Sequence, residues 1–574
     1  MTRKIRRFAR LGLMFLTCVL FAVYIPPQAD ASFSDRVIRV GLYYGSNALP
    51  SANLANEVGS GYQFGTYNSS GTFTPLGSTA QEKITVCKDA NLYLSSGSFY
   101  ETPTAADYQL IGAYHIQMPD TYTTYEAAAQ AAAAYPYGFP AYVNGNYVVR
   151  FEFYSSAANA EADAAAYSGA QVVGGSKTCY TVVNTATGQI LFEFDNGGDY
   201  LGIQPMSSGE RARTWFKGYQ YYGGFQYMRR SGNDISVINF VNEDLYVSGV
   251  LPYEFVVNND LESLKAGAVA IRTFSRASTK HSALGFDICN TTDCQVYRGV
   301  YTGAGAQLVL DAVEQTGGQC AYYNGALIEA LYFSSDGGAT EDAVNAWGSD
   351  VPYLKGKVDP YEDSISFNGK SWSYTVTPSE IQSLMQSKGY NCGTVTGLEV
   401  TKTTAMGNVN ELTITDSNGK KFTFTGDNVR VLQNLPGVTY MSRRFQIAPI
   451  GSQSTENPAT TTGDNSLSVY DGNTTVKSDT ITVITGSGTQ QVTAPATVIT
   501  DSGTVTVGEN GDSGSSGSSS GSTQTGGNGQ GWTITGGGFG HNIGMSQWGA
   551  YAMGQQGYSY EDILKFYYTG ITIQ

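Results

Sequence analysis

Short runs of alternating hydrophobic and polar residues, separated by Gly, Ser and Asn clusters, dominate the first 200 positions of the chain. Such alternation is typical of half-buried strands. The strand-like runs lie at 37–42, 84–86, 147–153, 171–173 and 181–183. Two alanine-rich stretches, 125–134 and 156–167, instead predict helices, and Ser156 is a suitable cap for the second. Further strands and helices are intermixed from 213 to 447, so the sequence predicts an α+β fold.

The chain has several parts that differ in pattern and composition, and it is too long for one domain. The expected parts are a signal peptide (1–31), a β-rich N-terminal region (32–119), a small αβ module (120–195), a dense domain of mixed strands and helices (196–447), a low-complexity Ser/Gly/Thr-rich insertion (448–531) and a C-terminal part (532–574). Residues 513–531 contain only Ser, Gly, Thr, Gln and Asn, a composition typical of a flexible linker. Because about 43 residues are marginal as an independent domain, we expect the C-terminal part to pack onto the dense domain.

The N-terminus has the layout of a secretory signal. Five basic residues between Arg3 and Arg10 precede an apolar run at 11–25, and Ala29-Asp30-Ala31 follows. This order predicts cleavage before Ser32 and a location outside the cell, in the wall or at the outer face of the cytoplasmic membrane. An uncleaved membrane anchor is the alternative, although the run is shorter than a comfortable membrane span.

The net charge limits which partners the chain can bind, and the cysteine content indicates whether disulfides hold the fold together. The chain has 574 residues and a formal net charge of −15, which argues against a nucleic-acid partner because phosphate binding needs a basic face. Six of the seven cysteines follow the predicted signal, and an exported chain can form disulfides. Six cysteines are nevertheless sparse over this length, so disulfides are not expected to be the main scaffold.

Glu254 is the strongest candidate for a catalytic group. Apolar and aromatic residues surround it, Leu251 to Tyr253 on one side and Phe255 to Val257 on the other. A carboxyl group with such neighbours loses solvation in its charged form, which raises its pKa. A general acid for glycosidic cleavage needs a carboxyl group that stays protonated near neutral pH. A surface or ion-paired glutamate is the alternative that spacing alone leaves open.

A helix is predicted after Asp260, and one of its faces carries arginines. Arg272 and Arg276 lie on the stripe that also contains Lys265 and Val269. An arginine there could pair with a carboxylate or hold an acetamido or lactyl oxygen of a sugar. A solvated helix face is equally compatible with the periodicity.

His281, Cys289 and Cys294 form a cluster of soft ligands with the spacing H-x7-C-x4-C. Two thiolates and an imidazole suit zinc, with a fourth ligand or water completing the tetrahedron. A disulfide between Cys289 and Cys294 is the alternative in an oxidising compartment.

The motifs resemble those of the SpoIID/LytB family (stage II sporulation protein D-like). The matching segments run in the family's order: 241–276, 286–299, AVEQTG at 312–317, YFSSDGGATED at 332–342, PYLK at 352–355 and GFGHNIGMSQWGA at 538–550, followed by Ile563-Leu564 and Tyr567-Tyr568. They cover about 213–447 and 532–574, which indicates that the family's end motif follows a long insertion. Asn542 stands where the family usually has glycine, which puts the backbone conformation there in question.

The resemblance implies a peptidoglycan lytic transglycosylase that cuts between N-acetylmuramic acid and N-acetylglucosamine and leaves a 1,6-anhydro-muramoyl end. It maps the catalytic glutamate onto Glu254. It also implies structural zinc at His281, Cys289 and Cys294, with no cofactor required for the chemistry. Substrate-binding positions are expected at Arg272, Gln295, Tyr353, Lys355, His541 and Gln547. His541 and Gln547 lie in a glycine-rich stretch that could line the glycan cleft or serve only the fold, and His541 is not assumed to be a general base.

One glutamate suffices for this chemistry. Hydrolytic glycosidases need two carboxyl groups, one of them to activate water or to form a covalent intermediate. In a lytic transglycosylase the C6 hydroxyl of the sugar attacks the anomeric carbon, so Glu254 can act first as acid and then as base. The resemblance also leaves open a different class, a non-catalytic wall-binding protein or amidase enhancer of the LytB type. Its partners would be peptidoglycan and a cell-wall amidase.

A weaker resemblance concerns the module at 120–195. The strand at 147–153, the helix at 156–167 and the two short strands after it resemble the tail of a SPOR domain, which recognises peptidoglycan glycan without peptide stems. An ordinary small αβ module is the alternative.

Overall fold

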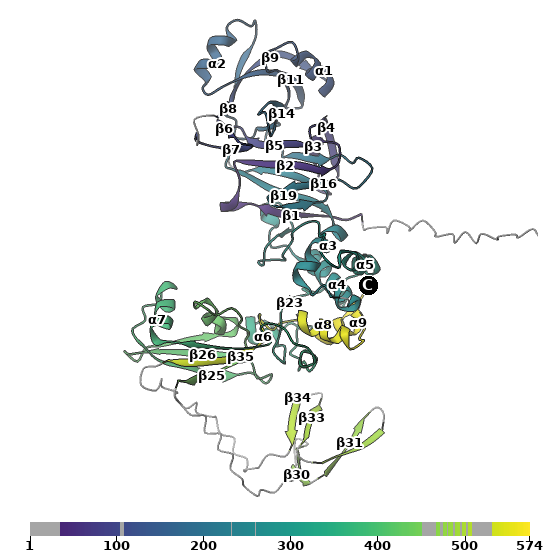
Figure 1. Ribbon diagram of the computed structural model, residues 1–574, viewed down its shortest axis with the longest axis vertical. Coiled ribbons are helices and arrows are strands. Elements are labelled where there is room, and N and C mark those ends of the chain that lie inside the picture. The colour runs from purple at the N-terminus through teal and green to yellow at the C-terminus, as the bar shows by residue number, and fades with distance from the viewer. Residues whose placement is uncertain are drawn as a thin grey trace, which may run out of the picture.

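The computed structural model describes residues 35–103, 108–230, 232–258, 260–450 and 531–574, together with six short strands between 467 and 507. The structure contains both helices and several β-sheets, which confirms the predicted α+β class (Figure 1). The predicted signal peptide lies outside the described residues. Among the described helices, none is long and apolar enough to cross a membrane.

A seven-stranded sheet joins the beginning of the chain to residues near 240. Its order is β20 (Ile288–Cys289), β1 (Val37–Tyr43), β19 (Ile235–Asn242), β18 (Gly224–Arg229), β15 (Leu201–Pro205), β3 (Tyr62–Tyr67) and β4 (Phe73–Thr79). Strands β1 and β19 are antiparallel, with Val37 opposite Asn242. In Figure 1 the purple β1 accordingly lies beside the teal β19.

A ten-stranded sheet contains most of the remaining N-terminal strands. Its order is β12 (Gln171–Gly174), β9 (Tyr114–Tyr122), β11 (Asn146–Tyr154), β10 (Phe139–Val143), β14 (Ile190–Asp195), β13 (Tyr180–Asn184), β5 (Lys83–Lys88), β2 (Ser51–Val58), β16 (Arg213–Phe216) and β17 (Tyr219–Tyr221). Two short helices, α1 (Tyr125–Ala132) and α2 (Ala157–Ala164), pack on it.

The expected boundaries at 119/120 and 195/196 do not separate sheets. Strand β5 pairs with β13, and β2 pairs with β16, so strands from three expected parts form one sheet. The reason is that strand pairing depends on contacts between distant segments, which composition along the chain does not report. The segment that resembles a SPOR tail is likewise part of this larger sheet, and that resemblance stays a prediction.

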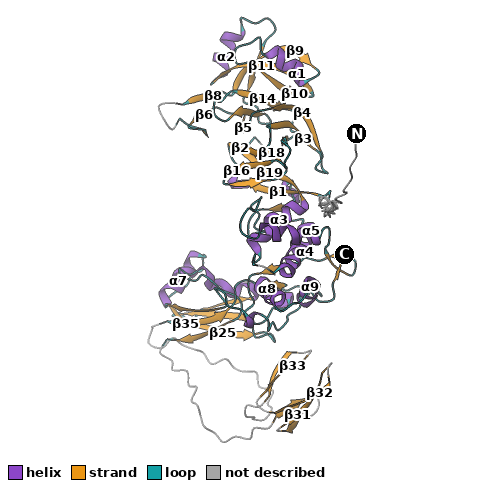
Figure 2. Ribbon diagram, turned by 45° about the vertical axis from the view of Figure 1, so that its right-hand side comes forward, coloured by secondary structure: helices purple, strands orange, loops and turns teal. Residues whose placement is uncertain are grey.

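Five helices pack against one another, and α3 joins them to β1 and β19 of the seven-stranded sheet (Figure 2). They are α3 (Glu243–Glu254), α4 (Leu261–Ala277), α5 (Ala306–Gln315), α8 (Gln547–Gln555) and α9 (Tyr560–Tyr567). Asn242 and Asp260 cap α3 and α4 by accepting hydrogen bonds from backbone N–H groups of the first turn. The apolar faces of the helices join the sheet residues in one continuous hydrophobic core.

A smaller lobe has its own core. It contains α7 (Pro378–Ser387) and two three-stranded sheets, β25 (Val395–Thr403), β26 (Val409–Asp416) and β27 (Lys421–Thr425) in one, and β24 (Ser371–Val376), β35 (Trp532–Gly537) and β28 (Phe445–Pro449) in the other. Strand β35 lies between β24 and β28. The C-terminal part thus completes the earlier domain, as its short length predicted.

The chain between β28 and β35 is the expected insertion. Its described strands pair as three hairpins: β29 (Leu467–Tyr470) with β30 (Thr475–Ser478), β31 (Thr480–Thr485) with β32 (Gly488–Thr493), and β33 (Ala496–Thr500) with β34 (Gly503–Val507). The predicted linker at 513–531 lies outside the described residues except for Gly531.

Candidate active site

A groove of about 250 Å³ lies where the end of α3 meets the C-terminal segment. The residues that line it come from four separate stretches of chain: Glu254, Thr292, Cys294, Tyr332, Phe333, Ser334, Phe539, Gly540, His541 and Gln547. The short parallel pair of β23 (Tyr332–Phe333) and β36 (Met545–Ser546) aligns two of these stretches. Three of the predicted substrate or catalytic residues, Glu254, His541 and Gln547, therefore share one groove.

Glu254 is the last residue of α3, and its carboxylate is held from two sides. The backbone N–H of Val296 donates to Oε1 at 2.7 Å, and Nε2 of Gln547 donates to Oε2 at 3.2 Å. Burial raises the pKa of Glu254, and these two hydrogen bonds only partly oppose the rise. Among the described residues, Glu254 thus has no ion-pair partner and is not freely solvated, and the rise of its pKa is in the direction that a general acid requires.

Gln547 reaches Glu254 because the C-terminal motif begins a helix at the groove. Ser546 caps α8 by accepting a hydrogen bond from the N–H of Gly549, so Gln547 is the first helical residue. Its side chain contacts Glu254 directly, so the predicted residues Gln547 and Glu254 lie together in the groove.

His541 lines the groove as a neutral imidazole. Burial lowers its pKa to about 4. Its Nδ1 accepts a hydrogen bond from the N–H of Ile543 at 3.1 Å, so the proton of the neutral ring is on Nε2. The backbone oxygen of Tyr332 accepts the hydrogen bond of the other ring nitrogen, so the imidazole has no free nitrogen to act as a base.

Gln295 lies behind the groove and not in it. It is buried, accepts a hydrogen bond from the Tyr246 hydroxyl at 2.8 Å and donates to the Tyr332 hydroxyl at 3.0 Å. Because Tyr332 lines the groove, Gln295 orients a groove residue and does not meet the substrate directly, in contrast to the expectation.

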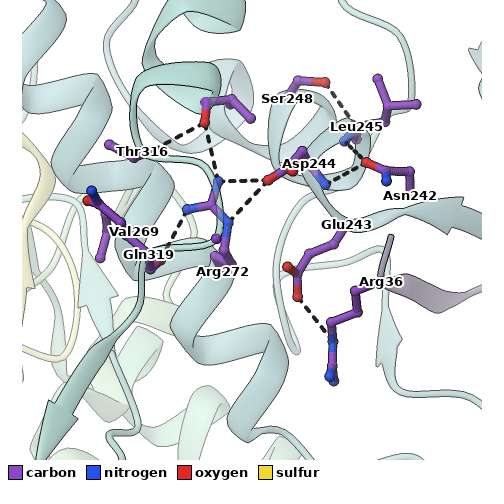
Figure 3. A network of polar contacts seen from close by, with 12 residues as sticks. Arg36, Asn242, Glu243, Asp244, Leu245, Ser248, Val269, Arg272, Thr316 and Gln319 are labelled. Carbon is purple, nitrogen blue, oxygen red and sulfur yellow. Dashed lines mark hydrogen bonds and ion pairs between the residues drawn. The ribbon is translucent and has the colours of Figure 1, made fainter. Parts of the chain in front are cut away.

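Arg272 does not face the groove. Its side chain is 0% exposed and points from α4 toward Asp244 of α3 (Figure 3). Nη2 and Nε lie 2.9 and 3.2 Å from Asp244 Oδ1, and the backbone oxygens of Val313 and Gln319 accept the remaining hydrogen bonds. We therefore assign Arg272 a structural role, which is to link α4 to α3. The predicted contact with a sugar is not made, because the guanidinium is paired with Asp244. The arginine stripe of α4 is packed against α3 and α5, so it is not a solvated face.

Tyr353 and Lys355 also lie outside the residues that line the groove. The Tyr353 hydroxyl accepts a hydrogen bond from the N–H of Glu329, and Lys355 pairs with Asp350. Their expected contact with substrate is thus not made in this groove. The prediction rested on the position of these residues in a sequence motif. A motif does not show in which direction a side chain points.

The predicted soft ligands do converge. His281, Cys289, Cys294 and a fourth residue, Asp293, offer ligand atoms that all lie within 4.8 Å of one another. The six cysteines of the described chain are free thiols, so the alternative Cys289–Cys294 disulfide is not formed. A hydrogen bond from Cys294 lowers the pKa of the Cys289 thiol to about 4, which favours a thiolate. One imidazole, two sulfur atoms and a carboxylate fit tetrahedral zinc, and Asp293 was not anticipated from the sequence.

The asparagine that replaces the family's glycine keeps the backbone that glycine would adopt. Asn542 has φ +65°, in the left-handed region where asparagine is tolerated better than other side chains. Its Nδ2 donates to the backbone oxygens of Asp336 and Ala339, and its Oδ1 accepts from the N–H of Arg443. The side chain thus adds contacts between the two lobes without changing the turn.

Several groove residues were missed from the sequence. Tyr332, Ser334 and Phe539 lie in motifs that the resemblance had identified, yet nothing in the motifs distinguished them from their neighbours. Phe539 is 40% exposed, unusual for a phenylalanine beside a buried glutamate, and suits contact with the apolar face of a sugar ring.

Comparisons with known proteins agree with the motifs. Residues 231–323 match the SpoIID family model, described as stage II sporulation protein. The chain is 30% identical over 385 residues to the amidase enhancer of Bacillus subtilis (strain 168), which covers 66% of this chain and 47% of that protein. It is 27% identical over 358 residues to stage II sporulation protein D of the same organism, an alignment that covers 59% of this chain and 76% of that protein. It is also 27% identical to stage II sporulation protein D of Bacillus amyloliquefaciens, over 354 residues that cover 59% of this chain and 75% of that protein.

The predicted resemblance to the SpoIID/LytB family is thus confirmed: residues 231–323 match the SpoIID model, and the chain is similar to an amidase enhancer and to stage II sporulation protein D. It spans about half the length of the amidase enhancer that it matches.

Proposed function

We propose that this protein is an exported lytic transglycosylase of peptidoglycan. Its similarity to the SpoIID/LytB family links it to the cell wall and to sporulation proteins. The observation that carries the proposal is Glu254, whose raised pKa and place in the groove suit a proton donor. It is the only carboxylate among the described residues that line the groove, which matches a reaction that needs one acidic group.

The reaction follows from this single group. Protonated Glu254 gives its proton to the oxygen that bridges N-acetylmuramic acid and N-acetylglucosamine, and the bond from that oxygen to the anomeric carbon breaks. The C6 hydroxyl of the muramic acid attacks the anomeric carbon, and the Glu254 carboxylate accepts the hydroxyl proton. Glu254 returns to its protonated state, and no water is consumed.

The surrounding groups support both protonation states. The donors from Val296 and Gln547 stabilise the carboxylate after the first transfer, and the burial of Glu254 favours its protonated form before it. His541 and the exposed Phe539 ring line the groove and can contact sugar substituents. We expect them to hold the glycan rather than to move protons.

We also propose structural zinc at His281, Cys289, Asp293 and Cys294. The ion would fix the loop that carries Thr292 and Cys294, both of which line the groove. It would thus shape the groove wall and supply no proton or nucleophile.

A second candidate function is enhancement of a cell-wall amidase without catalysis, favoured by the likeness to a protein named amidase enhancer. The two are separated by incubating the purified protein with peptidoglycan, with and without prior amidase digestion. New glycan ends produced without any amidase support the transglycosylase. Sedimentation with the wall and faster amidase release, without new glycan ends, supports the enhancer.

A further inference from the structure

Three acidic side chains meet in the interior, where the smaller lobe joins the rest of the described chain. Asp336 follows β23, and Asp359 and Glu362 come from the segment between α6 (Ala343–Trp347) and β24. Their exposed fractions are 0%, 2% and 2%, and their carboxylate oxygens all lie within 4.8 Å of one another. Three carboxylates so close together repel one another strongly when ionised and buried.

Neutral donors satisfy only part of this cluster. Tyr567 donates to Asp359 at 2.5 Å, Ser335 and Ser546 donate to Glu362 at 2.7 and 2.5 Å, and the N–H of Gly338 donates to Asp336 Oδ1. The other oxygen of Asp336, Oδ2, is buried and has no hydrogen-bond partner. Among the described residues, the ion pairs of the chain do not include any of the three carboxylates.

We infer that Asp336, Asp359 and Glu362 bind a hard divalent cation. All available ligands are oxygens, a donor set that suits Ca²⁺, Mg²⁺ or Mn²⁺ and not the softer ions held by Cys and His. The unpartnered Oδ2 of Asp336 supplies the open ligand position. This cation site is separate from the soft-ligand cluster at His281, Cys289, Asp293 and Cys294.

The cation would connect the carboxylate cluster to the catalytic groove. Glu362 accepts its hydrogen bond from Ser546, the cap of α8, and the next residue is Gln547, which contacts Glu254. Ser335 exchanges backbone hydrogen bonds with Phe539, a groove residue. Binding at the cluster therefore stabilises the C-terminal segment where it closes the groove.

Protonation is the competing way to relieve the repulsion. Burial, together with the charges of Asp359 and Glu362, raises the pKa of Asp336 well above its usual range. A proton held between Asp336 and Asp359 would replace the cation.

The test measures metal in the purified protein and in two variants. Elemental analysis of the wild type should find one hard divalent ion per chain in addition to any zinc, and Asp336→Asn should lose that ion while keeping its zinc. Asp363→Asn is the matched control, because Asp363 is an exposed neighbour of Glu362. After chelation and restoration of zinc, millimolar Ca²⁺ should raise the Tm of the wild type by about 5 °C and leave Asp336→Asn unchanged.

Several results would overturn the inference. One such result is a wild type that contains no such ion and whose Tm does not respond to Ca²⁺, Mg²⁺ or Mn²⁺. That result would show that protonation, and not a cation, neutralises the cluster. If Asp336→Asn fails to fold, the wild-type measurements decide alone. Because zinc content and glycan cleavage are recorded on the same samples, a failure here is distinguishable from a failure of the proposed function.

Discussion

Gln547 Nε2 lies 3.2 Å from Glu254 Oε2, although 293 positions separate the two residues in the chain. The contact depends on the pairing of β23 with β36, which brings the C-terminal motif to the groove after the insertion. The groove is thus assembled from segments on both sides of the insertion, residues 254–334 and residues 539–547.

Gln547→Ala tests whether this contact tunes the proton donor. The hydrogen bond from Gln547 lowers the pKa of Glu254, so its loss should raise that pKa further. We expect the basic limb of the pH–rate profile to move to higher pH and the maximal rate to fall about tenfold. Gln556→Ala, an exposed glutamine at the other end of the same helix, serves as control. An unshifted profile with normal rates would remove Gln547 from the mechanism.

Arg272→Met tests the structural role of the α3–α4 ion pair. The substitution removes the buried ion pair between Arg272 and Asp244, so the free energy of unfolding should fall by about 3–5 kcal/mol. Asp244→Asn combined with Arg272→Met should recover part of this loss. Lys565→Met, which breaks an exposed pair with Glu561, should change stability by less than about 1 kcal/mol. Arg272→Met with wild-type stability but weakened glycan binding would restore the predicted sugar contact.

His541 should make the protein less stable in acid. Burial lowers its pKa to about 4, whereas the unfolded chain titrates near pH 6.5, so the unfolded state binds more protons between these values. Stability is therefore full above pH 6.5 and falls as pH drops toward 4, by up to about 3 kcal/mol. Denaturant unfolding at pH 7 and pH 4.5 should show a smaller difference in His541→Gln than in the wild type. Equal differences in the two proteins would contradict the lowered pKa.

Cys294→Ser should lose zinc and reshape the groove, because Cys294 belongs both to the soft-ligand cluster and to the groove lining. Metal analysis should find stoichiometric zinc in the wild type and in Cys392→Ser, whose cysteine is buried in the smaller lobe, and little in Cys294→Ser. Substoichiometric zinc in the wild type, together with a mapped Cys289–Cys294 disulfide, would exclude the metal.

The local elements could be predicted from the sequence, because alternation and capping are local. The run at 37–42 is β1 and the run at 147–153 is β11, each within a residue or two. Their partners could not be predicted, since pairing of Val37 with Asn242 depends on contacts that no local pattern records.

The residues of the candidate site likewise include some that the sequence predicted and some that it could not predict. Apolar neighbours correctly indicated a buried Glu254, and the glycine-rich motif indicated His541 and Gln547. The direction of Arg272 could not be inferred, because one helical stripe can face either a cleft or another helix. Asp336, Asp359 and Glu362 lie up to 26 positions apart, and only the folded loops bring their carboxylates together.

The most direct measurement of the central claim is mass spectrometry of the glycan ends released from purified peptidoglycan by the wild type and by Glu254→Gln. The wild type should release 1,6-anhydro-muramoyl ends, and Glu254→Gln should release at least about 10²-fold fewer, while Glu314→Gln, an exposed glutamate of α5, should match the wild type. Equal release of anhydro ends by Glu254→Gln and the wild type, or none by the wild type, would contradict the account.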